Sequence, residues 1–195
     1  MNALHFSTAK RLRPMEGLQS CGDAVIGVHE GDWRLFAVID ALGHGPDAEK
    51  SAKAAQHAAT QARGQPLSDV FEAVHRSLPG LRGVVMSALL SHREEFTFAG
   101  VGNVEIFSPE GVARPVAMAG TLGGSAYRFR PFPLPLRAGQ RWVLASDGIK
   151  AREAGVLLPK LSGTPAEAAA EHLMNSVTRA NDDASVLVID VEMNT

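Results

Sequence analysis

The sequence predicts an α+β protein in which two packed β-sheets are covered by helices. Strand-like segments open the chain, two helical segments follow, and a group of short strands leads to further helices and a last strand. This grouping of strands and helices is typical of α+β folds. The chain has 195 residues, which is the length of one domain with its own core. We therefore expect residues 1–195 to form a single domain.

The N-terminal part is expected to contain three strands. Residues 3–8 are predicted to form a short strand, and residues 10–20 a loop with a basic start. Two apolar segments, Val25–His29 and Trp33–Ile39, flank the tight turn Glu30–Asp32 and are predicted to form a β-hairpin. An aspartate lies at each outer end of this hairpin.

Helical and strand patterns follow in blocks. An alanine-rich segment at 46–62 and an amphipathic segment at 67–78 are predicted to be helices. The strands expected next are Val84–Ser91, Glu95–Val101, Val104–Phe107, Val112–Val116 and, as an edge or irregular strand with several prolines, Tyr127–Leu134. The elements expected last are a strand at Arg141–Ala145, a short helix at Ile149–Ala154, a helix from Pro165 to about Thr178 capped by Thr164, and a strand at Ser185–Val191.

Composition and charge argue against several classes of function. The net charge of −2 provides no basic footprint for nucleic acid. No apolar run approaches the roughly 20 residues that span a bilayer, and the N-terminus lacks the apolar core of a signal peptide. The one cysteine, Cys21, cannot form an internal disulfide and is compatible with a reducing compartment. We expect a cytoplasmic monomer that binds neither nucleic acid nor membrane.

Four aspartates lie at predicted strand ends, each beside a small residue or another carboxylate: Asp23, Asp40, Asp147 and Asp182. In a hairpin with matched arms, Asp23 and Asp40 end close together. Carboxylates brought together repel one another unless a cation is present, and oxygen ligands favour hard ions such as Mg²⁺ or Mn²⁺. Two such ions can acidify a water molecule and hold a phosphoryl group. Each aspartate alone is also typical of a turn, so the residue pattern leaves both a metal site and separate turn residues open.

Five sequence blocks, taken together in their order and spacing, resemble the signature of a known family. The blocks are Cys21-Gly22-Asp23, Asp40-Ala41-Leu42-Gly43-His44-Gly45, Gly100-Val101-Gly102-Asn103-Val104, Ser146-Asp147-Gly148 and Asn181-Asp182-Asp183-Ala184-Ser185. The family is the PPM-type serine/threonine phosphatases, and the resemblance is to their bacterial SpoIIE-like branch. The short chain and the Gly-Val-Gly-Asn block are most similar to the phosphatases of the stressosome.

This resemblance implies an αββα sandwich with two Mn²⁺ or Mg²⁺ ions at one end. By block matching, the metal ligands are Asp23, Asp40, Asp147, Asp182 and the carbonyl of Ala41, with Asp40 bridging both ions. Asp40 and Asp147 are the residues expected to be essential for catalysis. The implied substrate is phosphoserine or phosphothreonine on a STAS-domain partner, an anti-sigma antagonist or stressosome protein, attacked by metal-activated water.

The sequence departs from the family pattern at three points. Ala41 stands where relatives usually have glycine, which would strain the backbone if φ must be positive there. Only 35 positions separate Asp147 from Asp182, so we expect no flap subdomain and an open site. The arginine that many relatives use to hold phosphate is not identifiable. Arg11 and Arg13 are candidates by position, but they are more typical of a solvated basic turn.

Three functions therefore remain open. The first is a metal-dependent protein phosphatase. The second is a catalytically weak phosphatase-fold binding module in the same signalling pathway, a hypothesis that depends on Ala41. The third is a hydrolase of small phosphate esters. His44 is either a proton donor to the leaving oxygen or a turn histidine, and Cys21 has no partner base that would make it a nucleophile.

Overall fold

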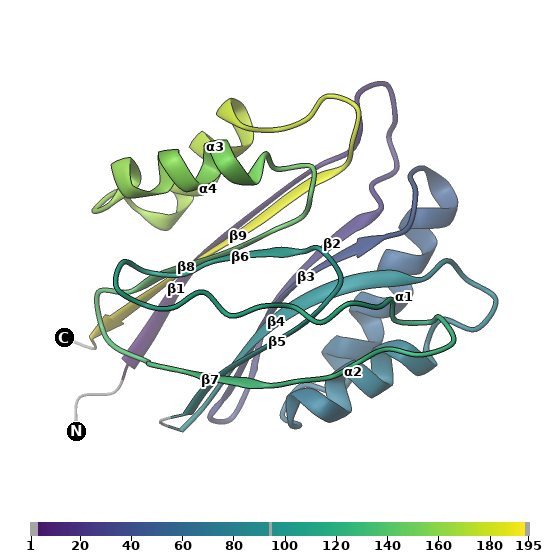
Figure 1. Ribbon diagram of the computed structural model, residues 1–195, viewed down its shortest axis with the longest axis horizontal. Helices are drawn as coiled ribbons and strands as arrows, with labels where there is room; N and C mark the ends of the chain where they lie inside the picture. The colour runs from purple at the N-terminus through teal and green to yellow at the C-terminus, as the bar shows by residue number, and fades with distance from the viewer. Residues whose placement is uncertain (1–3, 94, 194–195) are drawn as a thin grey trace.

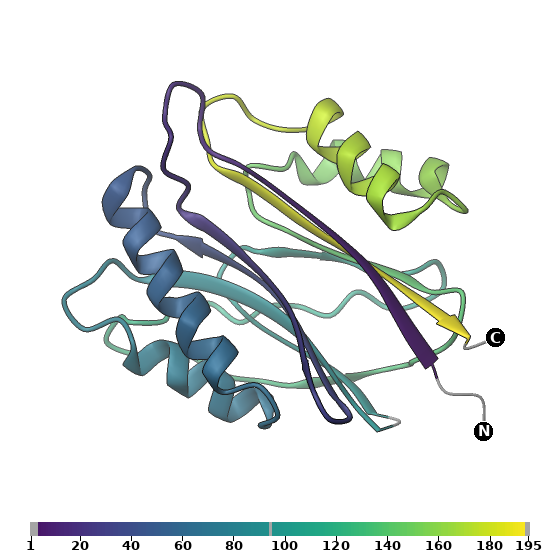
Figure 2. The ribbon, with the colours of Figure 1, turned by 180° about the vertical axis from the view of Figure 1, so that it is seen from behind.

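Four layers make up the computed structural model, which describes residues 4–93 and 95–193. Two antiparallel sheets pack face to face, and helices cover the outer face of each sheet (Figures 1 and 2). The predicted α+β class and the αββα sandwich are thereby confirmed. Residue 3, the start of the first predicted strand, lies outside the described residues.

One sheet has four strands in the order β1-β9-β8-β6. Their bounds are Leu4–Arg13 for β1, Ala184–Met193 for β9, Arg141–Ala145 for β8 and Glu105–Phe107 for β6. The other sheet has five strands in the order β2-β3-β4-β5-β7. Their bounds are Asp23–Glu30 for β2, Trp33–Ala41 for β3, Val84–His92 for β4, Glu95–Val101 for β5 and Phe132–Leu134 for β7.

The core lies in three apolar layers. Between the sheets, Phe36 and Phe98 of one sheet share a buried cluster with Trp142 and Ile189 of the other. Outside the five-stranded sheet pack α1 (Pro46–Gln61) and α2 (Leu67–Arg76), and outside the four-stranded sheet packs α4 (Ala166–Ser176). The short α3 (Ala151–Leu157) and the 3₁₀ helix η1 (Leu158–Leu161) complete that outer layer. Both sheets are therefore buried on two faces, which makes their strand ends rigid supports.

Several element bounds differ from the sequence-based prediction. Strand β1 continues to Arg13 instead of ending near residue 8, because its whole length pairs with β9, from Leu4 opposite Met193 to Arg13 opposite Ala184. Residues 112–116 form no strand, and Pro115 among them has no N–H to donate to a ladder. Of the proline-rich 127–134 segment, only β7 is a strand, and it lies at the sheet edge as expected.

The C-terminal helices also begin later than predicted. Pro165 occupies the N-cap position of α4, so the helix starts at Ala166, and Thr164 does not cap it. The Thr164 hydroxyl instead donates to the carbonyl of Leu161 at 2.7 Å. Between β8 and β9 the described chain contains only α3, η1 and α4, in agreement with the expectation of no flap subdomain.

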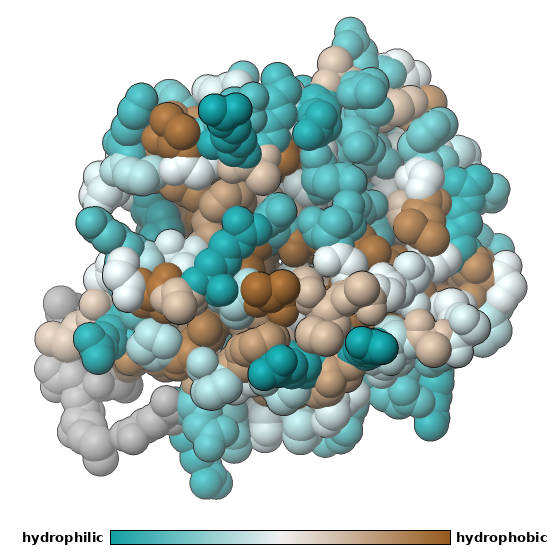
Figure 3. Space-filling view, viewed as in Figure 1, coloured by the Kyte–Doolittle hydropathy of each residue, from teal (hydrophilic) through white to brown (hydrophobic). Residues whose placement is uncertain are grey.

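The described helices are all too short or too polar to cross a membrane. On the face shown in Figure 3, hydrophobic side chains are interspersed with hydrophilic ones. The core side chains named above are buried.

Candidate metal centre

The first pair of predicted ligands is set by the register of the β2–β3 hairpin. Asp23 lies directly opposite Asp40 in this antiparallel pair, as expected from the matched arms of the hairpin. Asp23 is buried, with 5% of its surface exposed, whereas Asp40 is half-buried. A backbone hydrogen bond from the N–H of Ala41 to the carbonyl of Gly22, at 2.9 Å, closes this end of the hairpin. The two carboxylates are thus fixed side by side on one strand pair.

The third predicted ligand, Asp147, comes from the opposite sheet. It follows β8 by two positions, and one oxygen of its carboxylate, Oδ2, accepts a hydrogen bond of 2.8 Å from the side-chain amide of Asn103. Sequence reasoning missed Asn103 as a residue of the site. Its place directly after the end of β5, in one of the five blocks, was the available signal for a role at the site.

Asp182 lies in the loop that leads into β9, next to Asp183. The loop is joined to the turn after β8 by two backbone hydrogen bonds of 2.8 Å, from Lys150 to Val177 and from Arg179 to Gly148. Asp183 is buried and uses both carboxylate oxygens to accept backbone hydrogen bonds. Both oxygens of Asp183 are therefore already hydrogen-bonded, and Asp182 stays the predicted ligand of this pair.

The electrostatics show that the four aspartates share one environment. Burial, and then the negative charges of Asp23, Asp147, Asp182 and Asp183, raise the pKa of Asp40 to about 8. Burial is also the main cause that raises the pKa of Asp23 to about 7, a rise that nearby hydroxyl groups of Ser146 and Ser185 oppose. The pKa of Asp182 is raised by burial and by Asp147. Segments far apart in the sequence thus bring four mutually repelling carboxylates together.

These residues fit a divalent cation. Within residues 4–93 and 95–193, no three His, Cys, Asp or Glu side chains are arranged so that they could hold a metal ion as they stand. The buried Oδ2 atom of Asp23 nevertheless has no hydrogen-bond partner in that part of the chain. A buried carboxylate oxygen without a partner, facing other carboxylates, is stabilised by a hard cation. All the candidate ligands are oxygens, so the donor set favours Mg²⁺ or Mn²⁺ over zinc.

Ala41 is not strained. Among the described residues the one non-glycine residue with positive φ is Arg93, so Ala41 adopts a conformation open to any residue. The replacement of glycine by alanine therefore does not distort the backbone, and the argument for an inactive binding module loses its basis. Cys21 is equally unsuited to be a nucleophile, since burial raises the pKa of its thiol to about 12.

The arginines proposed from the sequence are occupied elsewhere. Arg11 forms an ion pair of 2.7 Å with Glu167, and Arg13 donates through Nη2 to the carbonyl of Arg179 at 2.6 Å. Arg179 itself lies near the carboxylates: its Nε donates to the carbonyl of Asp147 at 3.0 Å. Its charge opposes the rise in the pKa of Asp182 that burial and Asp147 cause. Sequence reasoning missed Arg179, because only the fold brings residue 179 next to residue 147.

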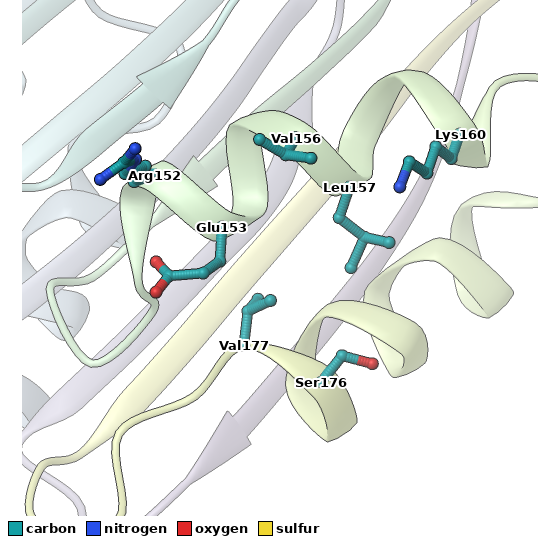
Figure 4. Close-up of a pocket in the computed structure, with 7 residues that line it drawn as sticks. All are labelled: Arg152, Glu153, Val156, Leu157, Lys160, Ser176 and Val177. Atoms are coloured by element: carbon teal, nitrogen blue, oxygen red, sulfur yellow. The ribbon is translucent and has the colours of Figure 1, made fainter.

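A hollow beside the C-terminal helices is separate from the carboxylates. It has a volume of about 400 Å³ and lies between α3, η1 and the end of α4, with Val156, Leu157 and Val177 on its walls (Figure 4). None of the four predicted ligands lines it. The carboxylates are therefore not part of this hollow.

Comparison with solved structures identifies the fold. No family model matches the chain. A chain from "The bacterial stressosome: a modular system that has been adapted to control secondary messenger signaling" is 30% identical, with a TM-score of 0.79 over 96% of this chain and 99% of that one. The catalytic domain of the serine/threonine phosphatase PstP, in complex with two manganese ions, has a TM-score of 0.78 at 18% identity and covers 97% and 100% of the two chains. The chain therefore has the fold of the PPM-type serine/threonine phosphatases.

Within this family the chain is similar to RsbX. The phosphoserine phosphatase RsbX of Bacillus subtilis (strain 168) is 24% identical over 189 residues, which cover 94% of each chain. The crystal structure of RsbX in complex with magnesium has a TM-score of 0.84 at 22% identity, over 98% of this chain and 100% of that one. The similarity therefore spans nearly the whole of both proteins.

Proposed function

We propose that this protein is an Mn²⁺- or Mg²⁺-dependent phosphatase that hydrolyses phosphoserine or phosphothreonine on a protein partner. The observation that carries the proposal is the convergence of Asp23, Asp40, Asp147 and Asp182 from two sheets, with the pKa of Asp40 raised to about 8 by burial and by the other carboxylates. Such crowding costs free energy in a folded protein and is typical of a functional site.

The proposed ligands are the carboxylates of Asp23, Asp40, Asp147 and Asp182, together with the carbonyl of Ala41. Asp40 would be the carboxylate shared by the two ions, a role supported by the contribution of the other three carboxylates to the rise in its pKa. When bound, the ions supply an activated water and positive charge for the phosphoryl group. The chain itself orients the site, since Asn103 holds one oxygen of Asp147 and leaves the other available.

Arg179 is the side chain that we propose to meet the phosphoryl group. Its Nε is held by the carbonyl of Asp147, which fixes the guanidinium beside the carboxylates, and its side chain is exposed. An arginine that is held through one nitrogen can still donate hydrogen bonds from its other guanidinium N–H groups to phosphate oxygens. The electrostatic attraction also offsets part of the negative charge that a phosphorylated partner meets on approach.

The proposed substrate is a phosphorylated STAS-domain regulator of a stress or sigma-factor pathway. RsbX, the relative matched over nearly the full length, is named a phosphoserine phosphatase, and another similar chain comes from a stressosome. The absence of a flap between β8 and β9 within the described residues leaves the carboxylates accessible to a folded domain. We further propose that residues 1–195 act as one domain, as a monomer and in the cytoplasm.

The test is phosphate release from a phosphoserine-bearing STAS domain, with and without Mn²⁺. We expect Asp40→Asn and Asp147→Asn to reduce the rate by at least about a hundredfold, while circular dichroism shows an unchanged fold. Asp190→Asn is the matched control, because Asp190 pairs with Arg141 on the same sheet as Asp147 and touches none of the predicted ligands. Activity that survives both active-site substitutions and EDTA would refute the proposal. Faster hydrolysis of free phosphoserine or p-nitrophenyl phosphate than of the phosphorylated protein would instead support a hydrolase of small phosphate esters.

A further inference from the structure

Asp183 is a buried carboxylate that is not among the proposed ligands. Only 4% of its surface is exposed. Oδ1 accepts a hydrogen bond from the backbone N–H of Met15, and Oδ2 accepts one from the backbone N–H of Gly22, both at 2.8 Å. Its partners are 168 and 161 positions away in the sequence. One side chain at the start of β9 therefore fastens both ends of the β1–β2 loop, and Figures 1 and 2 show that loop beside the chain entering β9.

The Gly22 backbone connects Asp183 to the hairpin ligands. Gly22 directly precedes Asp23, and its carbonyl accepts the N–H of Ala41, the residue after Asp40. The space around it is filled: a Cβ on Gly22 would lie 2.9 Å from Cβ of Ala48 and 3.0 Å from Oδ2 of Asp183. Neither hairpin aspartate can shift towards β9 or away from it without breaking one of these contacts.

Asp183 is also packed against the turn that carries Asp147. A Cβ on Gly148 would overlap the backbone carbonyl of Asp183, so these two backbones are in direct contact. Next to them, the N–H of Ser185 donates to the hydroxyl of Ser146 at 2.9 Å. Asp183 thus contacts Gly22 next to Asp23 and Gly148 next to Asp147, and it is covalently joined to Asp182. It is linked to Ala41, the residue after Asp40, only through Gly22.

We propose that Asp183 is a positioning residue whose buried carboxylate, bonded to the Gly22 and Met15 amides, sets the spacing between the hairpin ligands and Asp182 for divalent cation binding. This inference rests on the proposed function. A carboxylate suits the task because each oxygen can accept one N–H. The isosteric amide of asparagine can satisfy only one of the two donors and directs its own N–H groups at the other.

The experiment compares Asp183→Asn with wild type and with Asp190→Asn, which is the matched control. Each substitution removes the negative charge of a carboxylate whose two oxygens accept hydrogen bonds. Position 190 lies roughly 23 Å further along the path of β9 than position 183. By isothermal calorimetry we expect Asp183→Asn to weaken Mn²⁺ binding by about 10- to 100-fold, whereas Asp190→Asn changes it less than about twofold. In metal-free protein, amide exchange at Gly22 should speed up only in Asp183→Asn.

A second measurement needs no variant and so remains valid if Asp183→Asn does not fold. Thermodynamic coupling is reciprocal: if the Asp183–Gly22 bond favours the ion, the ion must favour the bond. Titration of wild type with Mg²⁺ should therefore slow hydrogen exchange at the Gly22 amide, observed by NMR.

The outcomes separate this inference from the proposed function. If wild type binds no Mn²⁺, the proposed function fails and the inference fails with it. If wild type binds Mn²⁺ but Asp183→Asn binds it equally well, or Mg²⁺ leaves Gly22 exchange unchanged, only the inference is overturned. Recovery of wild-type affinity in Asp183→Glu, with the Gly22 amide still unprotected, would overturn it as well, because charge alone would then account for the effect.

Discussion

Replacing Asp40 with asparagine should stabilise the metal-free protein at neutral pH. The carboxyl of Asp40 has its pKa raised from 3.8 to about 8 in the folded state, mainly by burial and then by Asp23, Asp147, Asp182 and Asp183. Between these two values the folded chain binds a proton that the unfolded chain has lost. The stability contributed by this group is therefore fully present below its unfolded pKa and is lost as the pH rises through its folded pKa.

The size of the effect follows from how steeply the free energy of unfolding changes with pH. One group that is protonated only in the folded state lowers the free energy of unfolding by about 1.4 kcal/mol per pH unit, so roughly 2.7 kcal/mol is lost between pH 5 and pH 7. For a chain of 195 residues, about 2–4 °C of melting temperature corresponds to 1 kcal/mol, which gives a fall of roughly 5–11 °C. The Asp40→Asn variant lacks this contribution, so its melting temperature should fall less.

The assay is thermal unfolding followed by circular dichroism, in chelator, across this pH range. Asp40→Asn should melt above wild type at neutral pH, and added Mn²⁺ should raise the melting temperature of wild type much more than that of the variant, because binding to the folded state stabilises it. The control Asp190→Asn should lower the melting temperature at acidic and neutral pH alike, since it removes a partner of Arg141. If the melting temperatures of wild type and Asp40→Asn changed equally with pH, the electrostatic reasoning would be refuted.

Three further predictions address the surroundings of the carboxylates. Gly148→Ala should abolish metal binding or folding, because the new Cβ would overlap the Asp183 carbonyl. Calorimetry measures the binding and circular dichroism the fold. Wild-type metal binding by a folded variant would mean that this contact is dispensable. Arg179→Ala should raise KM for the phosphoprotein by about tenfold or more and leave Mn²⁺ affinity unchanged, so an unchanged KM would remove Arg179 from the substrate site. Arg141→Ala should lower the free energy of unfolding in urea by about 3–5 kcal/mol, because it leaves Asp190 unpaired, and should leave the activity per folded molecule unchanged. A loss of activity at full stability would contradict a purely structural role for Arg141.

The parts of the fold that local sequence determines were predictable. The β2–β3 hairpin has a tight turn and matched apolar arms, and these fix the register that places Asp23 opposite Asp40. The order of strand and helix blocks was sufficient for the α+β class. Residues 112–116 were misassigned because their apolar pattern resembles a strand, although Pro115 cannot join a ladder and nothing pairs with them in the described sheets.

The parts of the site that depend on long-range contacts were not predictable. Nothing near Asn103 in the sequence indicates that its amide meets Asp147, 44 positions away. Arg11 and Arg13 were reasonable candidates by position, but strand pairing directs Arg11 to Glu167, whereas loop closure brings Arg179 to the site. Tertiary contacts of this kind become visible only when the two sheets are packed together.

The most direct test of the central claim is a crystal grown or soaked in MnCl₂ and measured at the manganese absorption edge. The account predicts two anomalous peaks among the carboxylates of Asp23, Asp40, Asp147 and Asp182, with Asp40 in contact with both. Peaks elsewhere, or none among these side chains at saturating Mn²⁺, would contradict it.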